Sequence, residues 1–144
     1  MHDVVIRNAM LFDGTGAPPA TGDIAIDGDT IAAVGTAGGG RRTIDGRGLA
    51  VAPGFIDVHT HDDFAALLHA DMGFKTAGGV TTCVVGNCGL GAAPYPAAAR
   101  LAAGLHPGLS LPAWDGYRGY LAEIERHSPG ANIAALVGHG TARL

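Results

Sequence analysis

Ala52-Pro-Gly-Phe-Ile-Asp-Val-His-Thr-His61 places two histidines at the end of a short apolar run that follows a Pro-Gly break. The run predicts a β-strand, and side chains of a strand alternate between its two faces. His59 and His61 are therefore expected to point the same way. Neutral imidazole nitrogens suit zinc and similar borderline ions, so the pair is a candidate metal clamp. In the alternative interpretation, the two histidines only end a strand and meet solvent.

A second run, Val80-Thr-Thr-Cys-Val-Val-Gly-Asn-Cys-Gly89, predicts a strand followed by a glycine turn. Its nearly continuous apolar character is typical of a parallel strand that is buried on both faces. The turn sets Cys88 just beyond the C-terminal end of the strand, where parallel sheets assemble their active sites. A thiolate there could join the two histidines on one cation. Cys83, in mid-strand, fits a buried and unreactive cysteine better.

The pattern of the remaining sequence changes near Val51. Before it, short strands separated by turns are predicted, with Asp27-Gly-Asp29 as a hairpin signal. After it, strands alternate with helices, which favours βα units and a parallel sheet. The expected elements of this second part are a strand at 50–58, a helix at 63–76, a strand at 80–85, a short helix at 97–103 within a long loop, a helix at 114–127, and a strand at 131–137.

The motifs at 52–63, at 79–82 (Gly-Val-Thr-Thr) and at 86–89 (Gly-Asn-Cys-Gly) together resemble the amidohydrolase superfamily. Within it, the chain is most similar to the N-acyl-D-amino-acid deacylases, or D-aminoacylases. The resemblance implies an α/β fold: the N-terminal part of a (β/α)8 TIM barrel, about three βα units, preceded by part of a small β-sandwich. Residues 1–50 would form the partial β-sandwich domain, and residues 51–144 a truncated metal-dependent TIM-barrel catalytic domain.

The resemblance also implies site residues and a reaction. The metal ligands would be His59, His61 and Cys88, holding Zn²⁺ as one or two divalent ions. The reaction would be hydrolysis of the amide bond of a small-molecule N-acyl-D-amino acid. The family's catalytic aspartate and two further metal-binding histidines would lie beyond Leu144, so no catalytic residue is assigned in this chain and the chain alone is expected to be inactive.

Other polar residues near the predicted strand ends have open roles. Asp57 could hold a ligand imidazole as an outer acceptor, or cap an adjacent backbone group. Asp62 and Asp63 are expected to cap the following helix. His139 could contact substrate or a metal-bound oxygen. Arg143 could pair with a substrate carboxylate, although solvation is the simpler role.

Length bounds these expectations, because a complete (β/α)8 barrel takes about 250 residues and this chain has 144. The simplest reading is an N-terminal fragment of an enzyme. Two alternatives remain open. The chain could belong to a cyclic-amide hydrolase of the hydantoinase or dihydroorotase type, which would be expected to lack the Gly-Asn-Cys-Gly turn. It could also be a non-catalytic, truncated metal-binding domain.

Composition points to a cytoplasmic protein with no nucleic-acid or membrane partner. A net charge of −4 does not suggest the basic surface that nucleic-acid-binding proteins use. No apolar run approaches the roughly 20 residues of a membrane helix, and the N-terminus does not read as a signal peptide. The two cysteines are too far apart on an extended chain for a disulfide. The sequence indicates no particular oligomeric state.

Overall fold

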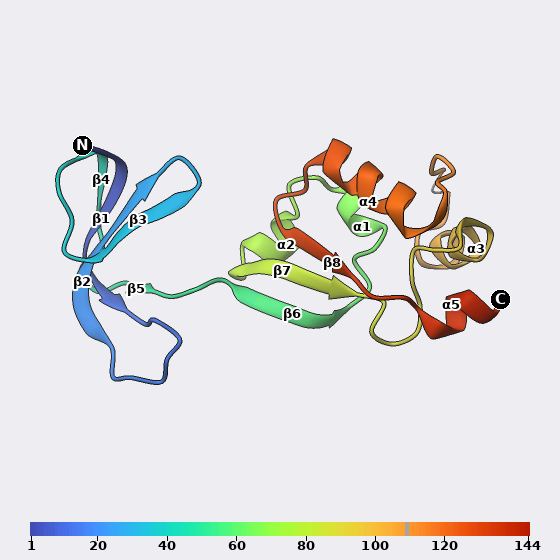
Figure 1. The fold of residues 1–144 in the computed structure, drawn as a ribbon, viewed down its shortest axis with the longest axis horizontal. Helices are drawn as coiled ribbons and strands as arrows, with labels where there is room; N and C mark the ends of the chain where they lie inside the picture. Colours follow the sequence, from blue (N-terminus) through green and yellow to red (C-terminus); the bar gives the residue numbers. More distant parts are fainter. Residues whose placement is uncertain (109) are drawn as a thin grey trace. The chain divides into compact units, whose positions relative to one another are not determined.

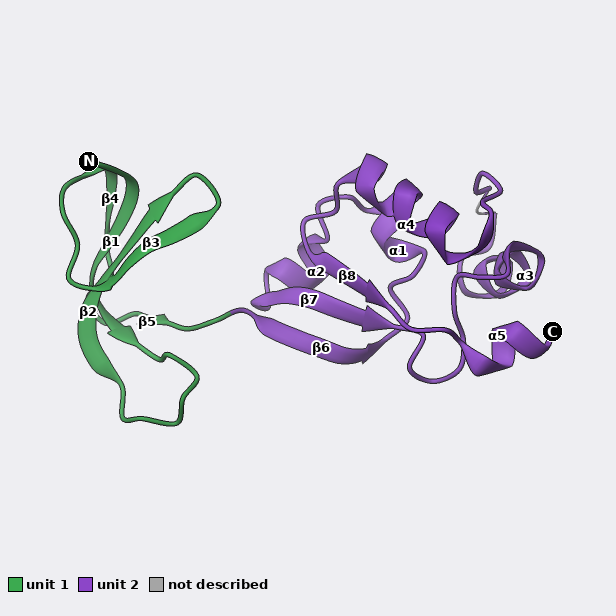
Figure 2. Ribbon diagram, in the orientation of Figure 1, with its two compact units in different colours: residues 1–53 green, residues 54–144 purple. Residues whose placement is uncertain are grey.

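The computed structural model describes residues 1–108 and 110–144, and the chain divides into two compact units (Figure 2). Unit 1 is Met1–Pro53 and unit 2 is Gly54–Leu144. Across the described residues, no helix is both long and apolar enough to cross a bilayer.

Unit 1 holds one five-stranded sheet in the described residues (Figure 1). Its strands are β1 (His2–Leu11), β2 (Ala20–Asp27), β3 (Thr30–Gly35), β4 (Gly40–Asp45) and β5 (Ala50–Val51). The central β1 pairs antiparallel with β2 and parallel with β4 and β5. The predicted hairpin is confirmed: β2 and β3 pair antiparallel, and Gly28 in the turn adopts the left-handed φ of +58°. A sandwich needs a second sheet layer, so that part of the fold stays a prediction.

Unit 2 alternates strands with helices. Its elements are β6 (Phe55–Thr60), α1 (Ala65–Leu68), α2 (Gly73–Thr76), β7 (Val80–Val85), α3 (Tyr95–Leu105), α4 (Gly116–His127), β8 (Asn132–Ala135) and α5 (His139–Arg143). The three strands form a parallel sheet in the order β6-β7-β8, with their C-terminal ends at one edge (Figure 1). The parallel sheet expected from the strand–helix alternation is confirmed, and a mixed α/β architecture follows.

Several expected boundaries were wrong. Residues 50–51 do not begin the strand expected at 50–58, because Ala50 and Val51 pair with β1 in unit 1. The strand expected at 131–137 is shorter, since β8 covers only Asn132–Ala135. A five-residue helix, α5, follows Gly138 and was not predicted.

The single helix expected at 63–76 is two short helices separated by irregular backbone. Met72, before the second helix, is fully buried and has a left-handed backbone conformation, with φ of +49°, through which a right-handed helix cannot continue. Phe64 and Leu67 of this stretch are buried, whereas Leu68 is 40% exposed and Phe74 is 53% exposed.

Asp62 and Asp63 do not cap the helix that follows them, contrary to expectation. Phe64 is the N-cap residue of α1, and no side chain bonds the first turn. The Asp62 carboxylate instead accepts a hydrogen bond from the Thr60 hydroxyl at 2.6 Å. Asp63 is buried, and its Oδ1 has no hydrogen-bond partner among the described residues.

Aromatic side chains hold the long segment between β7 and α4 against the core of unit 2. Trp114 packs edge-on against Tyr95, at 4.9 Å between ring centroids, and lies 5.6 Å from Tyr120. Its indole N–H donates to the carbonyl of Ala92 at 2.7 Å, and the Tyr120 hydroxyl donates to the carbonyl of Asp63 at 2.9 Å. These bonds satisfy buried polar groups and fix the loops around the strand ends.

Candidate metal centre

Three donor side chains gather where β6 and β7 end. His59 lies in the last part of β6, His61 follows that strand directly, and Cys88 lies in the turn after β7. One ligand atom from each lies within 4.8 Å of the other two. All three side chains are exposed, which leaves room for a ligand from solvent. The structure therefore brings together the three residues singled out from the sequence, and metal binding by them stays a prediction.

The local fold explains this gathering. β6 and β7 are parallel neighbours, so their C-terminal ends lie at the same edge of the sheet. Thr60, between the two histidines, turns inward and is buried. The imidazole rings of His59 and His61 stand side by side, with their centroids 6.1 Å apart.

The Gly-Asn-Cys-Gly turn is closed tightly and tied to the neighbouring strand. Gly86 adopts a φ of +88°, and a Cβ there would come within 2.3 Å of the Leu136 carbonyl oxygen, so only glycine fits. The amide of Asn87 donates to the carbonyl of Val58 at 2.8 Å. This bond joins the turn that carries Cys88 to β6, which carries His59 and ends just before His61.

The spacing of one donor pair, Cys88 and His61, fits a zinc ion. Cys88 Sγ lies 3.6 Å from His61 Nε2 and 3.8 Å from His61 Nδ1. With bonds of about 2.3 Å to sulfur and about 2.0–2.1 Å to nitrogen, a tetrahedral zinc ion separates the two donors by about 3.6 Å. Two imidazoles and one thiolate also match the borderline softness of zinc.

A charged network lies behind the two histidines. The Lys75 ammonium, from α2, donates to Asp57 Oδ2 at 2.7 Å and lies 3.1 Å from Asp62 Oδ2. It also donates to the Thr60 hydroxyl at 3.0 Å. Lys75 is the only lysine in the chain, and no motif or spacing in the sequence predicts its place in this network.

Asp57 takes the second of its two predicted roles. Its Oδ1 accepts the backbone N–H of His59 at 3.2 Å, and its other oxygen binds Lys75. Those two hydrogen bonds, that of Lys75 foremost, lower the pKa of Asp57. The carboxylate is therefore ionised at neutral pH and acts on the backbone beside His59, with no hydrogen bond to an imidazole in the described residues.

Two other titratable groups of unit 2 are buried. Burial raises the pKa of Asp63 to about 6, and the nearby charge of Asp62 adds to this effect. Burial likewise raises the pKa of the Cys83 thiol to about 11, so it stays protonated at neutral pH. Cys83 is fully buried, as expected from its place in mid-strand.

His139 and Arg143 lie on α5, next to the turn that carries Cys88. The Thr141 backbone N–H donates to the Gly89 carbonyl at 3.1 Å, and the Thr141 hydroxyl accepts the N–H of Gly91 at 2.8 Å. The side chains of His139 and Arg143 are exposed, and neither has a hydrogen bond or ion pair to the three donors in the described part of the chain. Their roles toward substrate stay predictions.

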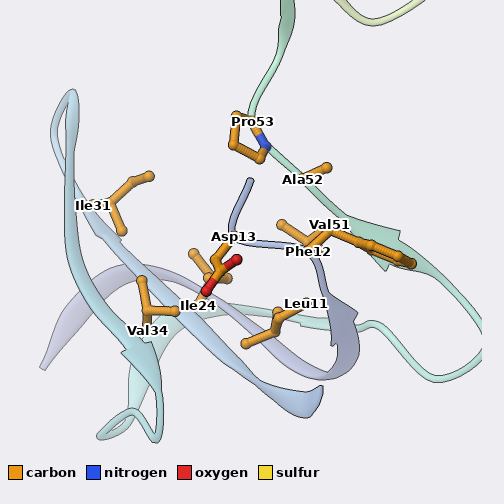
Figure 3. A pocket seen from close by; sticks show the side chains of 9 residues that line it. All are labelled: Leu11, Phe12, Asp13, Ile24, Ile31, Val34, Val51, Ala52 and Pro53. Carbon is orange, nitrogen blue, oxygen red and sulfur yellow. The ribbon is translucent and has the colours of Figure 1, made fainter. Parts of the chain in front are cut away.

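Unit 1 has a hollow of its own, of about 260 Å³ (Figure 3). Leu11, Phe12, Ile24, Ile31 and Val34 are among its lining residues. Asp13 is the one charged residue in its wall, so the hollow lacks the group of donors that a hydrolytic site or a metal site requires.

Comparisons with known proteins point to one family. Residues 42–143 match the model of the amidohydrolase family. An N-acyl-D-glutamate deacylase of Alcaligenes xylosoxydans xylosoxydans is 40% identical over 144 residues, covering 99% of this chain and 30% of that protein. An N-acyl-D-aspartate deacylase of the same organism is 41% identical over 149 residues, covering 99% of this chain and 29% of that protein.

A solved structure agrees with these matches. The N-acyl-D-glutamate deacylase of Bordetella bronchiseptica, complexed with zinc and a phosphonate inhibitor that mimics the tetrahedral intermediate, has a TM-score of 0.83 and 39% identity. The match covers 99% of this chain and 31% of that one. The chain thus spans less than a third of the length of the relatives that it matches.

Proposed function

The chain belongs to the amidohydrolase family, and on that premise we propose that it takes part in zinc-dependent hydrolysis of the amide bond of N-acyl-D-amino acids. The observation that carries the proposal is the meeting of His59, His61 and Cys88 donor atoms within 4.8 Å at the edge where two parallel strands end. The similarity to N-acyl-D-glutamate and N-acyl-D-aspartate deacylases supports the choice of substrate.

His59 and His61 would hold the ion as neutral imidazoles, and Cys88 would hold it as a thiolate. When bound, zinc would supply a Lewis acid that polarises a carbonyl group and brings the pKa of water to about 7. The thiolate adds the one negative charge of the donor set. The exposure of all three donors leaves the solvent side of the site open to a substrate amide.

We place β6, β7 and β8 as the first three strands of a (β/α)8 barrel, with the three donors on its C-terminal face. Active sites of that fold lie on that face and draw residues from several strands. The remaining metal ligands and the proton-transferring aspartate would then come from later strands. The 144-residue chain alone is therefore expected to lack activity.

The test measures amine release from N-acetyl-D-glutamate and N-acetyl-D-methionine, with N-acetyl-L-methionine as the stereochemical control. The assay uses the 144-residue chain and the product of the reading frame extended beyond codon 144, each with and without zinc. We expect zinc-dependent release from the D-substrates by the extended product alone. Release by neither product, or equal release from the L-substrate, would contradict the proposal.

A further inference from the structure

His59, His61 and Cys88 form a group of donors that we call the metal corner. The charged network of Lys75, Asp57, Asp62 and Thr60 has no part in the proposed reaction, yet its members flank the two histidines in the sequence. We propose that Lys75 is a positioning residue that fixes His59 and His61 for metal binding, without touching the metal or the substrate. This inference rests on the proposed function, because it presumes that the corner binds zinc.

Regular hydrogen bonds between β6 and β7 do not fix the position of His59. The register of the β6–β7 pairing shifts between Asp57 and Thr60, where β6 contains one residue more than β7. His59 lies within this irregular stretch. A bulge of this kind re-aims the side chains that it carries, and it also removes regular hydrogen bonds that would hold them. The end of β6 therefore depends on other bonds for its geometry.

Lys75 supplies these bonds from both sides of the bulge. It binds Asp57, two residues before His59, at 2.7 Å. It also binds Thr60, between the histidines, at 3.0 Å and lies 3.1 Å from Asp62, the residue after His61. The Asp57 carboxylate in turn accepts a hydrogen bond from the backbone N–H of His59, which links Lys75 to that residue.

The ammonium group has no hydrogen-bonding capacity left for a substrate. An ammonium carries three N–H donors and no acceptor, and Lys75 faces three oxygen acceptors. Burial works to lower the pKa of Lys75, but its hydrogen bonds with Asp57 and Asp62 outweigh burial and the pKa is raised. Lys75 therefore stays charged and saturated, which fits a positioning role.

The test compares zinc affinity by equilibrium dialysis, which gives zinc bound per chain whatever the state of association. The variants are Lys75→Met, which removes the ammonium, Lys75→Arg, which keeps the charge, and Arg100→Met, which removes an exposed cation of α3. Groups that orient metal ligands typically change metal affinity by about 10–100-fold when they are mutated. We expect a loss of this size for Lys75→Met, partial recovery for Lys75→Arg, and the affinity of the unmodified chain for Arg100→Met.

Cobalt substitution separates positioning from mere support of the fold. The d–d absorption bands of bound Co²⁺ report the geometry of its ligands, and the sulfur-to-cobalt charge-transfer band reports Cys88. We expect Lys75→Met to alter the d–d bands while the charge-transfer band persists. Zinc affinity and cobalt spectra equal to those of the unmodified chain would overturn the inference, whatever happens to thermal stability.

A second variant covers the case in which Lys75→Met does not fold, as judged by far-UV circular dichroism. Asp57→Asn keeps the size of the side chain and its acceptor for His59, but it weakens the link to Lys75. It should lower zinc affinity and alter the cobalt bands in the same direction, and an unchanged affinity and spectrum would count against the inference. If the unmodified chain binds no zinc, the proposed function fails first.

Discussion

Cys88 Sγ lies 3.6 Å from His61 Nε2, across the gap between the ends of two parallel strands. Twenty-seven residues of sequence separate them, so their meeting is a product of the fold. The separation is the one that a tetrahedral zinc ion imposes on a sulfur and a nitrogen ligand.

Replacing Cys88 with serine should weaken zinc binding by more than about tenfold, a loss of about 1.4 kcal/mol. A hydroxyl is a harder and poorer ligand for zinc than a thiolate at neutral pH. Cys83→Ala is the control for loss of a thiol, because Cys83 is buried whereas Cys88 is exposed and belongs to the donor group. The measurement is the zinc retained per chain after dialysis. Equal losses of zinc in both variants would show that the effect comes from folding and not from loss of a ligand.

Asn87 should matter to metal binding although it is not a ligand. Asn87→Ala removes the bond to the Val58 carbonyl, which ties the Cys88 turn to β6, so zinc affinity should fall severalfold. Asn132→Ala is the control, because it removes a similar amide-to-carbonyl bond, to Thr81, away from the corner. Isothermal titration with zinc measures both, and a larger loss in the control would refute this role.

Asp63 should make stability depend on pH. Its pKa is about 6 in the folded chain and about 3.9 in an unfolded one, so the folded state binds the proton more tightly. The contribution of Asp63 to the free energy of unfolding is therefore greatest below pH 4, and it falls by about 3 kcal/mol as the pH rises through 6. Asp63→Asn should raise the thermal midpoint at pH 8 and leave it nearly unchanged at pH 4. Circular dichroism follows both transitions, and equal midpoints at pH 8 would contradict the prediction.

The chain should self-associate through the edge of its parallel sheet. Phe55, Ile56 and Val58 of β6 are 60–66% exposed, and no other strand of the described residues pairs with the outer edge of β6. Exposed apolar edges recruit other chains. Ile56→Lys should reduce association in sedimentation velocity, whereas Leu105→Lys, at an exposed position on α3, should not. A monodisperse monomer of the unmodified chain with a sharp unfolding transition would count against this.

The metal corner could be found from the sequence because two local rules define it. Alternation along a strand puts His59 and His61 on one face, and parallel strands end at one edge, which brings Cys88 beside them. These rules need only short runs of residues. The parallel arrangement of β6, β7 and β8 followed from the same kind of pattern.

Lys75 could not be found in this way, because its position depends on tertiary packing. The sequence predicted one helix at 63–76. The left-handed backbone at Met72 interrupts that helix, and the second segment, α2, carries Lys75, which binds Asp57. Asp62, before the first segment, bonds Thr60 and lies 3.1 Å from Lys75 instead of capping the helix.

X-ray absorption at the zinc edge shows whether His59, His61 and Cys88 hold one zinc ion together. With zinc bound to the unmodified chain, we expect a sulfur neighbour at about 2.3 Å and nitrogen neighbours at about 2.0–2.1 Å. Cys88→Ser should remove the sulfur shell, and Cys83→Ala should keep it. A first shell of nitrogen and oxygen alone in the unmodified chain, or a sulfur shell that survives Cys88→Ser, would contradict the account.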